Sequence, residues 1–171
     1  MHHLTIAAHL QLCIIISVTK IFKYEHLIFK HSQMVFQIFQ MAATSSRQLK
    51  NVCVLSRFHY GKYKDFVQAT IDLGRVLIER KIHPVYGGGD RWLSRLVSQA
   101  TFIGGSQVIG IIPEALKILG CLPSPPIREE LVVSDMKKRI TETLKHTGAF
   151  IFLLGDLATL ETLITFVSWA H

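Results

Sequence analysis

The chain has few cysteines and few acidic side chains, and these two shortages already exclude several classes of protein. Its 171 residues include only three cysteines, Cys13, Cys53 and Cys121. They are too few and too scattered for a disulfide framework or a zinc site. Cys53 lies within the apolar run NVCVL and is most simply a small buried residue. This cysteine usage fits a reducing compartment and predicts neither a bound metal nor a catalytic thiol.

Acidic residues are outnumbered, with 12 Asp and Glu against 19 Lys and Arg and a formal net charge of +7. Residues 1–50 contribute five basic and one acidic residue, or +4, and the remaining 121 contribute 14 and 11, or +3. A nucleic-acid-binding module concentrates Lys and Arg on one face, with aromatic residues between them. No such concentration is present, so we expect no nucleic-acid partner. Apolar residues make up 49% of the chain, which excludes a disordered class.

No apolar segment at the N-terminus is long enough for a membrane-spanning helix. Residues 6–18 (IAAHLQLCIIISV) are apolar but are interrupted by His9 and Gln11, and a spanning helix needs roughly 20 apolar residues. The run also lacks the basic leader and cleavage site of a signal peptide. A reversed signal anchor is the alternative; we favour an extension, residues 1–50, outside the fold, with the functional protein beginning near Met41. We expect no membrane association.

From residue 51 onward the chain alternates between apolar runs and helical periodicities. The runs at 51–55, 82–86, 107–113 and 149–154 predict four strands, mostly apolar on both faces. Apolar residues at steps of three and four predict helices around 65–79, 93–100, 136–144 and 160–167. The prolines in 121–130 (CLPSPPIREE) forbid regular structure there. The alternation predicts an α/β fold in one domain, residues 51–171: a Rossmann-like parallel sheet with helices on both faces.

The candidate site lies in the turns that follow the strands, because ligands of such sheets bind beyond the carboxyl ends of the strands. The glycines Gly87, Gly88 and Gly89 suit a close approach of backbone N–H groups to a phosphate at the next helix. Their spacing differs from G-x-G-x-x-G, so a tight strand-to-helix turn is the plainer alternative.

Three charged residues near helix starts have both a structural and a functional interpretation. Glu161 is either a first-turn acid that complements the helix dipole or an acid that acts on a ligand. Asp156 suits a helix N-cap. Arg139, in the basic run 137–139, is either part of a solvated turn or a phosphate clamp. Spacing alone does not separate these alternatives.

As a set, these segments resemble the Lonely Guy family of cytokinin-activating hydrolases. Residues 52–73 align with the opening of the family without gaps, and LIERKIHPVYGGG, GGSQVIGIIP, SDMKKR, AFIFLLG, TLE and SWAH follow in the order of the family. The resemblance covers about residues 51–171. It implies hydrolysis of the N-glycosidic bond of cytokinin riboside 5′-monophosphates, which releases the free cytokinin base and ribose 5-phosphate. It also implies a homodimer with sites near the dimer interface, no metal or organic cofactor, and a cytoplasmic location that extends to the nucleus.

The resemblance also assigns roles to individual positions. The catalytic arginine and glutamate of the family fall on Arg139 and Glu161. A carboxylate can stabilise the oxocarbenium-like state of glycoside cleavage while it guides water, and a guanidinium can hold phosphate or hydroxyl groups. The positions implied to bind substrate and phosphate are Gly87, Gly88, Gly89, Ile140, Gly155, Asp156, Ala158, Thr159 and Ser168.

The sequence departs from the family in its glycine-rich segments. In the signature P-G-G-x-G-T-x-x-E, Leu154, Asp156 and Ala158 replace the proline and two glycines, while Trp92 and Arg95 replace glycines after the triplet and Ile140 replaces a lysine. Asp156 adds negative charge beside a phosphate site. The family also continues past SWA with another strand, so we expect AFIFLL to be left as an apolar edge of the sheet. A catalytically inactive relative, either a truncated product or a dimer partner of intact members, is therefore the alternative function. A nicotinamide-dependent oxidoreductase is a weaker one, since G-x-G-x-x-G is absent.

Overall fold

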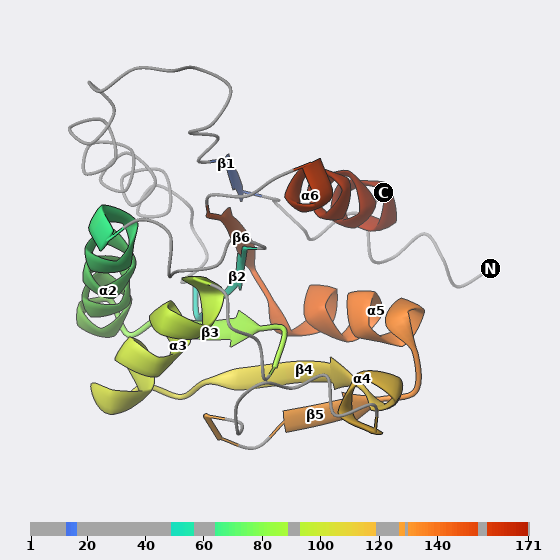
Figure 1. Cartoon of the computed structure of the whole chain (residues 1–171), viewed down its shortest axis with the longest axis horizontal. Helices are drawn as coiled ribbons and strands as arrows, with labels where there is room; N and C mark the ends of the chain where they lie inside the picture. Colours follow the sequence, from blue (N-terminus) through green and yellow to red (C-terminus); the bar gives the residue numbers. More distant parts are fainter. Residues whose placement is uncertain are drawn as a thin grey trace.

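The chain folds as a parallel α/β sheet, which confirms the predicted fold class (Figure 1). The computed structural model describes residues 13–16, 49–56, 64–88, 93–118, 127–128, 130–153 and 157–170. Six strands, all paired in parallel, lie in the order β1-β6-β2-β3-β4-β5. They are β1 (Cys13–Ile16), β2 (Asn51–Leu55), β3 (His83–Tyr86), β4 (Ile109–Pro113), β5 (Glu130–Val133) and β6 (Ala149–Phe152). The helices are α2 (Lys64–Glu79), α3 (Leu93–Ile103), α4 (Glu114–Ile118), α5 (Met136–His146) and α6 (Leu157–Ala170).

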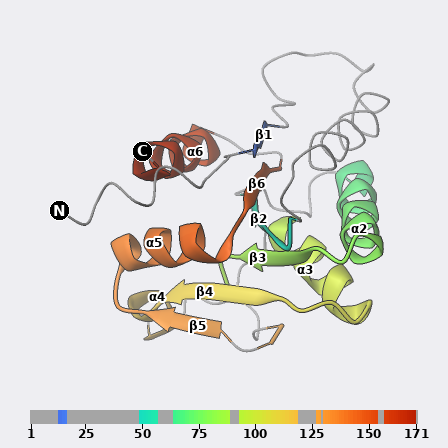
Figure 2. The same cartoon turned by 180° about the vertical axis from the view of Figure 1, so that it is seen from behind.

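Helices cover both faces of the sheet. Figures 1 and 2 show α2 and α3 together on one side and α5 and α6 together on the other. The strand order explains this arrangement: the chain moves from β2 to β4 in one direction and returns from β5 to β6 in the other. Because crossovers between parallel strands are right-handed, the reversal places α5 on the face opposite α2 and α3.

Alternate residues of the central strands supply two separate hydrophobic cores, one on each face. The core beneath α2 and α3 is built from Val52, Val54, Leu73, Leu77, Ile82, Val97, Ala149 and Ile151. The core beneath α5 and α6 is built from Cys53, Val85, Ile111, Val133, Phe150, Phe152, Leu163 and Phe166. All four residues of β6 are buried. Strands that are apolar on both faces therefore lie where the sequence predicts them, between two helical layers.

The edge beside β6 differs from the expectation. β6 lies between β2 and β1, and the residues of β1 from Cys13 to Ile16 pair in register with those of β6 from Ala149 to Phe152. The expectation that AFIFLL forms an open apolar edge is therefore wrong. The expectation that residues 1–50 stay outside the fold does not hold for residues 13–16, whose backbone extends the sheet. An apolar β-branched run suits this position because β6 offers an apolar edge.

Two elements between β4 and α5 were not predicted from the sequence. α4 follows β4 directly, and β5 forms the far edge of the sheet beside β4. The two middle residues of β5, Leu131 and Val132, are 38% and 40% exposed, so this strand is not a doubly buried run like β2, β3, β4 and β6. No described helix combines the length and apolar character needed to cross a bilayer.

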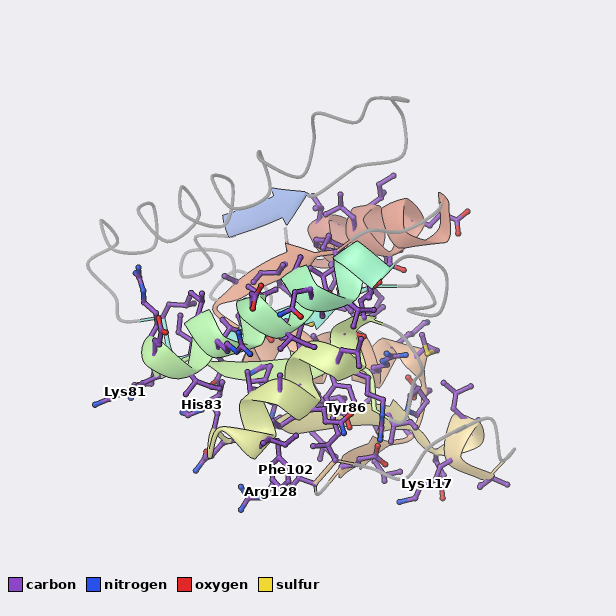
Figure 3. All side chains as sticks on the ribbon, turned by 60° about the vertical axis from the view of Figure 1, so that its left-hand side comes forward. Lys81, His83, Tyr86, Phe102, Lys117 and Arg128 are labelled. Carbon is purple, nitrogen blue, oxygen red and sulfur yellow. The ribbon has the colours of Figure 1, made fainter. Side chains whose placement is uncertain are left out.

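The two ends of the strands are well separated in space. Figure 3 shows Lys81 and His83, which lie where β3 begins, at one end of the molecule and Lys117, in α4, at the other. Tyr86, the last residue of β3, lies between them inside the molecule. The carboxyl ends of the strands, where a ligand is expected, therefore lie at the end marked by α4.

Candidate active site

Arg139 lies in the first turn of α5, as the sequence predicts. The helix begins just beyond the carboxyl end of β5, and the carboxylate of Asp135 caps it by accepting a hydrogen bond from the N–H of Lys138 at 2.8 Å. The carbonyl of Asp135 accepts a second bond from the N–H of Arg139, at 3.0 Å. The guanidinium Nη1 of Arg139 lies 4.0 Å from Sδ of Met136. The cap thus fixes the part of the helix from which Arg139 projects.

The charge of Arg139 acts on Cys53 in the middle of β2. Burial raises the pKa of the Cys53 thiol to about 12, and the positive charge of Arg139 opposes this rise. Arg139 itself is half-buried in α5. The thiol itself is protonated at neutral pH and has no access to solvent. This confirms the prediction that Cys53 is a small buried residue.

Glu161 is the fifth residue of α6 and is exposed. The prediction that it lies in the first turn is wrong, because the helix begins at Leu157. Its carbonyl accepts a hydrogen bond from Oγ1 of Thr165 at 2.8 Å. α6 follows β6, β6 pairs with β2, and α5 packs against α6 (Figure 1). Arg139 and Glu161 therefore project from neighbouring helices on one face of the sheet, each near the helix end that follows a strand.

Glu161 shares one face of α6 with exposed side chains that include apolar ones. Ile164 and Ser168 follow it at steps of three and four residues, which places all three on one side of the helix. Ile164 is 57% exposed and Trp169, next to Ser168, is 46% exposed. The hydroxyl of Ser168 donates to the carbonyl of Ile164 at 2.9 Å. This outer face of α6 (Glu161, Ile164, Ser168 and Trp169) combines a candidate catalytic acid with apolar surface.

The glycine turn after β3 has a specific steric reason. Gly88 has a φ of 73°, which side chains disfavour. A Cβ built on Gly88 would lie 2.9 Å from Oε1 of Glu130 and 3.1 Å from Cβ of Ile112. The interpretation as a tight turn therefore has physical support in the packing. Gly87 beside it is half-buried.

Sequence reasoning missed Glu130, which begins β5 and packs directly onto this turn. The available signal was an acidic residue directly before the apolar residues LVV, which together predict a short strand. The proline-rich connection before Glu130 obscured this signal. The carboxylate oxygens of Glu130 are buried. A negative charge thus lies at the turn where a phosphate was expected.

The other predicted binding residues fall into two groups. Ile140 is half-buried and packs against the core beneath α5 and α6, while Ala158 and Thr159 lie in the first turn of α6. Gly89, Gly155 and Asp156 lie outside the described residues. Their predicted roles in binding stay predictions. Among the described residues no group of His, Cys, Asp or Glu is arranged to hold a metal ion.

The cap of α5 gives a pH-dependent prediction. The N–H of Lys138, and after it the hydroxyl of Ser134, holds the pKa of Asp135 below its ordinary value of 3.8. Because the pKa of Asp135 is lower in the folded state, its ionised carboxylate stabilises the fold above pH 3.8. This stabilisation is lost as the pH falls through the lower, folded-state pKa. Asp135→Ala should therefore lower the melting temperature at neutral pH, and the difference should close in acid. Thermal unfolding followed by circular dichroism across pH 2–7, roughly the range over which such a carboxyl titrates, measures it.

The matched control for the cap is Asp135→Asn. Asparagine caps helices about as well as aspartate, so this variant should keep most of the neutral-pH stability and lose the pH dependence. Equal melting temperatures for the alanine variant and the wild type at neutral pH would contradict the role of the cap.

Comparisons with known proteins agree with the α/β architecture and identify the lineage of the chain. The chain is 40% identical over 132 residues to the probable cytokinin riboside 5′-monophosphate phosphoribohydrolase LOG6 of Arabidopsis thaliana, covering 77% of this chain and 65% of that one. It is 42% identical over 124 residues to LOG3 of the same plant, covering 72% and 57%. The rice (Oryza sativa subsp. japonica) relative LOGL2 is 39% identical over 132 residues, covering 77% and 54%. The chain thus spans between about half and two thirds of the length of these relatives. No protein-family model matches it.

The fold has a counterpart among solved structures. The crystal structure of TM1055, a structural genomics target, matches with a TM-score of 0.53 at 21% identity, covering 68% of this chain and 67% of that one. At this identity the match supports the fold only. The sequence relatives are closer and agree in name with one another. Over the part of their length that it spans, the chain is similar to the cytokinin riboside 5′-monophosphate phosphoribohydrolases of the Lonely Guy (LOG) family.

Proposed function

We propose that this protein hydrolyses the N-glycosidic bond of a cytokinin riboside 5′-monophosphate. The observation that supports this most directly is the placement of Arg139 and Glu161 on two helices that pack together beyond β5 and β6. A guanidinium and a carboxylate are the two groups that cleavage of a phosphorylated glycoside needs. The names of the relatives supply the substrate class.

In this reaction a water oxygen forms the new bond to C1′ of the ribose while the bond from C1′ to the base nitrogen breaks. The base leaves with the bonding electron pair and takes up a proton, and water supplies the hydroxyl of ribose 5-phosphate. Positive charge develops on the sugar in between. The carboxylate of Glu161 would stabilise that charge and orient the water. The guanidinium of Arg139 would hold the phosphate or sugar hydroxyls by charge-assisted hydrogen bonds.

Release of free base tests this proposal. Purified protein is incubated with isopentenyladenosine 5′-monophosphate, and the free base and ribose 5-phosphate are quantified by chromatography and mass spectrometry. The proposal expects equimolar products at a rate above that of the buffer and of a Glu161→Ala variant. Product at the same rate with the variant would contradict it.

A second candidate function is that of a catalytically inactive relative, a dimer partner of intact family members. The buried carboxylate of Glu130 at the glycine turn favours it, because a negative charge there opposes the phosphate interaction expected for that turn. Absence of base release from the purified protein, together with its pairing with an intact family member, would support this alternative. The cytoplasmic and nuclear location expected from the family stays part of the proposal, and imaging of a fluorescent fusion tests it.

We also propose that the protein forms a homodimer through the outer face of α6. Ile164 and Trp169 expose large apolar side chains there, next to Glu161, and adjoining exposed apolar residues commonly mark a protein interface. A site shared between subunits would explain why a catalytic acid lies on an otherwise apolar surface. The second copy of this chain is the occupant that this proposal requires.

Ile164→Glu should shift the protein from dimer to monomer, because it places a charge in the proposed interface. Sedimentation velocity at several concentrations measures the change, with a dissociation constant expected to rise by roughly tenfold or more. Ile103→Glu is the matched control, since Ile103 is 77% exposed on α3, on the opposite side of the sheet. A wild type that is monomeric throughout, or an equal effect of both variants, would contradict the proposed interface.

A further inference from the structure

The side chain of Glu130 follows a path that two glycines make available. Tyr86, Gly110 and Glu130 lie opposite one another on the adjacent strands β3, β4 and β5, and laterally paired residues of a parallel sheet face the same side. A Cβ on Gly110 would lie 3.1 Å from Cγ of Glu130 and 3.2 Å from Cε1 of Tyr86. The glutamate therefore passes over β4 where no side chain blocks it. Its Oε1 reaches the glycine turn at Gly88.

At that turn the carboxylate has no hydrogen-bond donor within the described part of the chain. Both Oε1 and Oε2 of Glu130 are shielded from solvent, and no N–H or O–H of the described residues donates to either oxygen. The contrast with Glu142 is clear, because the Glu142 carboxylate lies within ion-pair distance of Lys138, Lys145 and His146. Taking an unpaired carboxylate out of water is costly, so a buried acid of this kind points to a donor beyond the described residues, which a bound ligand would supply.

The chemistry of the turn separates two ligand groups by charge. A phosphate brought to Gly88 would meet the carboxylate, and like charges repel strongly where solvent is excluded. An N–H or O–H group would instead find an acceptor with both oxygens unused, and hydrogen bonds to an ionised acceptor are the stronger kind. Gly88 itself has no side chain to stand between ligand and carboxylate.

We propose that Glu130 is a specificity-determining residue that accepts a hydrogen bond from a donor of the ligand, either a nucleobase N–H or a sugar hydroxyl, and that the phosphate lies away from Gly88. The inference rests on the proposed function for the identity of the ligand as a nucleotide. It reassigns the glycine turn from the phosphate to the nucleoside part. The phosphate is left to Arg139 and the start of α6, on the other face of the sheet.

Binding measurements with three probes test the assignment without any need for turnover. The probes are adenosine 5′-monophosphate, ribose 5-phosphate and inorganic phosphate, each titrated by calorimetry into wild type, Glu130→Met and Glu130→Gln. Methionine keeps the length of the side chain and removes the acceptor and the charge, while glutamine removes only the charge. Glu79→Gln, at an exposed position at the end of α2 and away from the carboxyl ends of the strands, is the control for loss of a charge elsewhere.

We expect Glu130→Met to weaken binding of adenosine 5′-monophosphate by about tenfold or more. The affinity for inorganic phosphate should change by less than about twofold. Weaker ribose 5-phosphate binding would identify a sugar hydroxyl as the donor, and unchanged binding would identify the base. Glu130→Gln should lose less affinity for adenosine 5′-monophosphate, because its amide oxygen still accepts a hydrogen bond. Tighter phosphate binding in both variants would place phosphate at the turn and overturn the proposal, as would unchanged affinity for all probes. Thermal unfolding of each variant checks that it folds.

The outcomes also separate this inference from the proposed hydrolysis. Differences in probe affinity without base release would leave Glu130 as a nucleotide-binding residue in a protein that does not turn over. Base release together with unchanged probe affinities in the Glu130 variants would support the proposed hydrolysis. It would contradict the role of Glu130 in binding the ligand. A merely structural role predicts altered stability with no selective change among the three probes.

Discussion

Glu161→Gln should reduce the rate of base release at saturating substrate by roughly 10²–10⁴-fold, the range for a positioned acid–base group. The amide keeps the shape of the side chain but has no negative charge to stabilise the developing cation and no basicity to activate water. Glu161 is exposed and makes no contact that the core needs, so the substitution should leave the melting temperature nearly unchanged. Steady-state kinetics with isopentenyladenosine 5′-monophosphate measure kcat and KM separately.

Arg139 provides the companion measurement. Arg139→Gln removes the cation proposed to hold the phosphate or sugar hydroxyls, so it should raise KM as well as lower kcat. Glu79→Gln is the matched control for Glu161→Gln, because it removes an exposed carboxylate at the end of α2 and should leave both constants unchanged. Full activity of Glu161→Gln would show that the acid takes no part in the reaction. The family relationship would still stand, since it depends on sequence similarity.

The second large effect concerns Phe150 in β6, and it is an effect on stability. Phe150→Ala should lower the free energy of unfolding by about 3–5 kcal/mol, the usual cost of removing a large buried aromatic side chain. Phe150 is fully buried. Its ring centroid lies 4.9 Å from that of Phe166 in α6 and 6.2 Å from that of Phe152. A domain is typically stable by only about 5–15 kcal/mol, so the variant should approach the threshold of folding.

Urea unfolding followed by fluorescence or circular dichroism gives the free energies. Phe102→Ala is the control for loss of a phenyl ring, because Phe102 is 39% exposed at the end of α3. Its removal should lower the free energy of unfolding much less. Phe150 also connects the sheet to the helix that bears Glu161. Any residual folded Phe150→Ala should therefore lose activity as well. Equal destabilisation by the two variants would mean that the core beneath α6 contributes little.

The central strands and most helices could be predicted because each has a strong local pattern. Val52, Cys53 and Val54 form an apolar run without a polar face, and the structure buries all three between helices on both sides. The periodicity around Leu73 and Leu77 likewise predicts the buried stripe of α2. In both cases the hydrophobic effect acts on neighbouring residues, so the pattern is visible within a short window.

The edges of the sheet could not be predicted for the opposite reason. β5 is exposed at its two middle residues, and β1 is defined only by its pairing with β6, a strand more than a hundred residues away in the chain. β5 lacks the doubly apolar run of the interior strands, and the apolar run of β1 does not indicate which strand it joins. Backbone hydrogen bonding to a distant partner determines them, and no local window contains that partner.

The sequence alone determined the class of fold, the two-sided burial of its central strands, and Arg139 and Glu161 as the candidate catalytic pair. The tertiary structure alone brought Glu130 across β4 to Gly88, because this contact needs three strands in register and a glycine at position 110. It likewise placed Glu161 in the second turn of α6, among the exposed apolar residues. Local apolar patterns are set by neighbours in the chain, whereas the charge at the glycine turn is set by the distant side chain that the packing brings there.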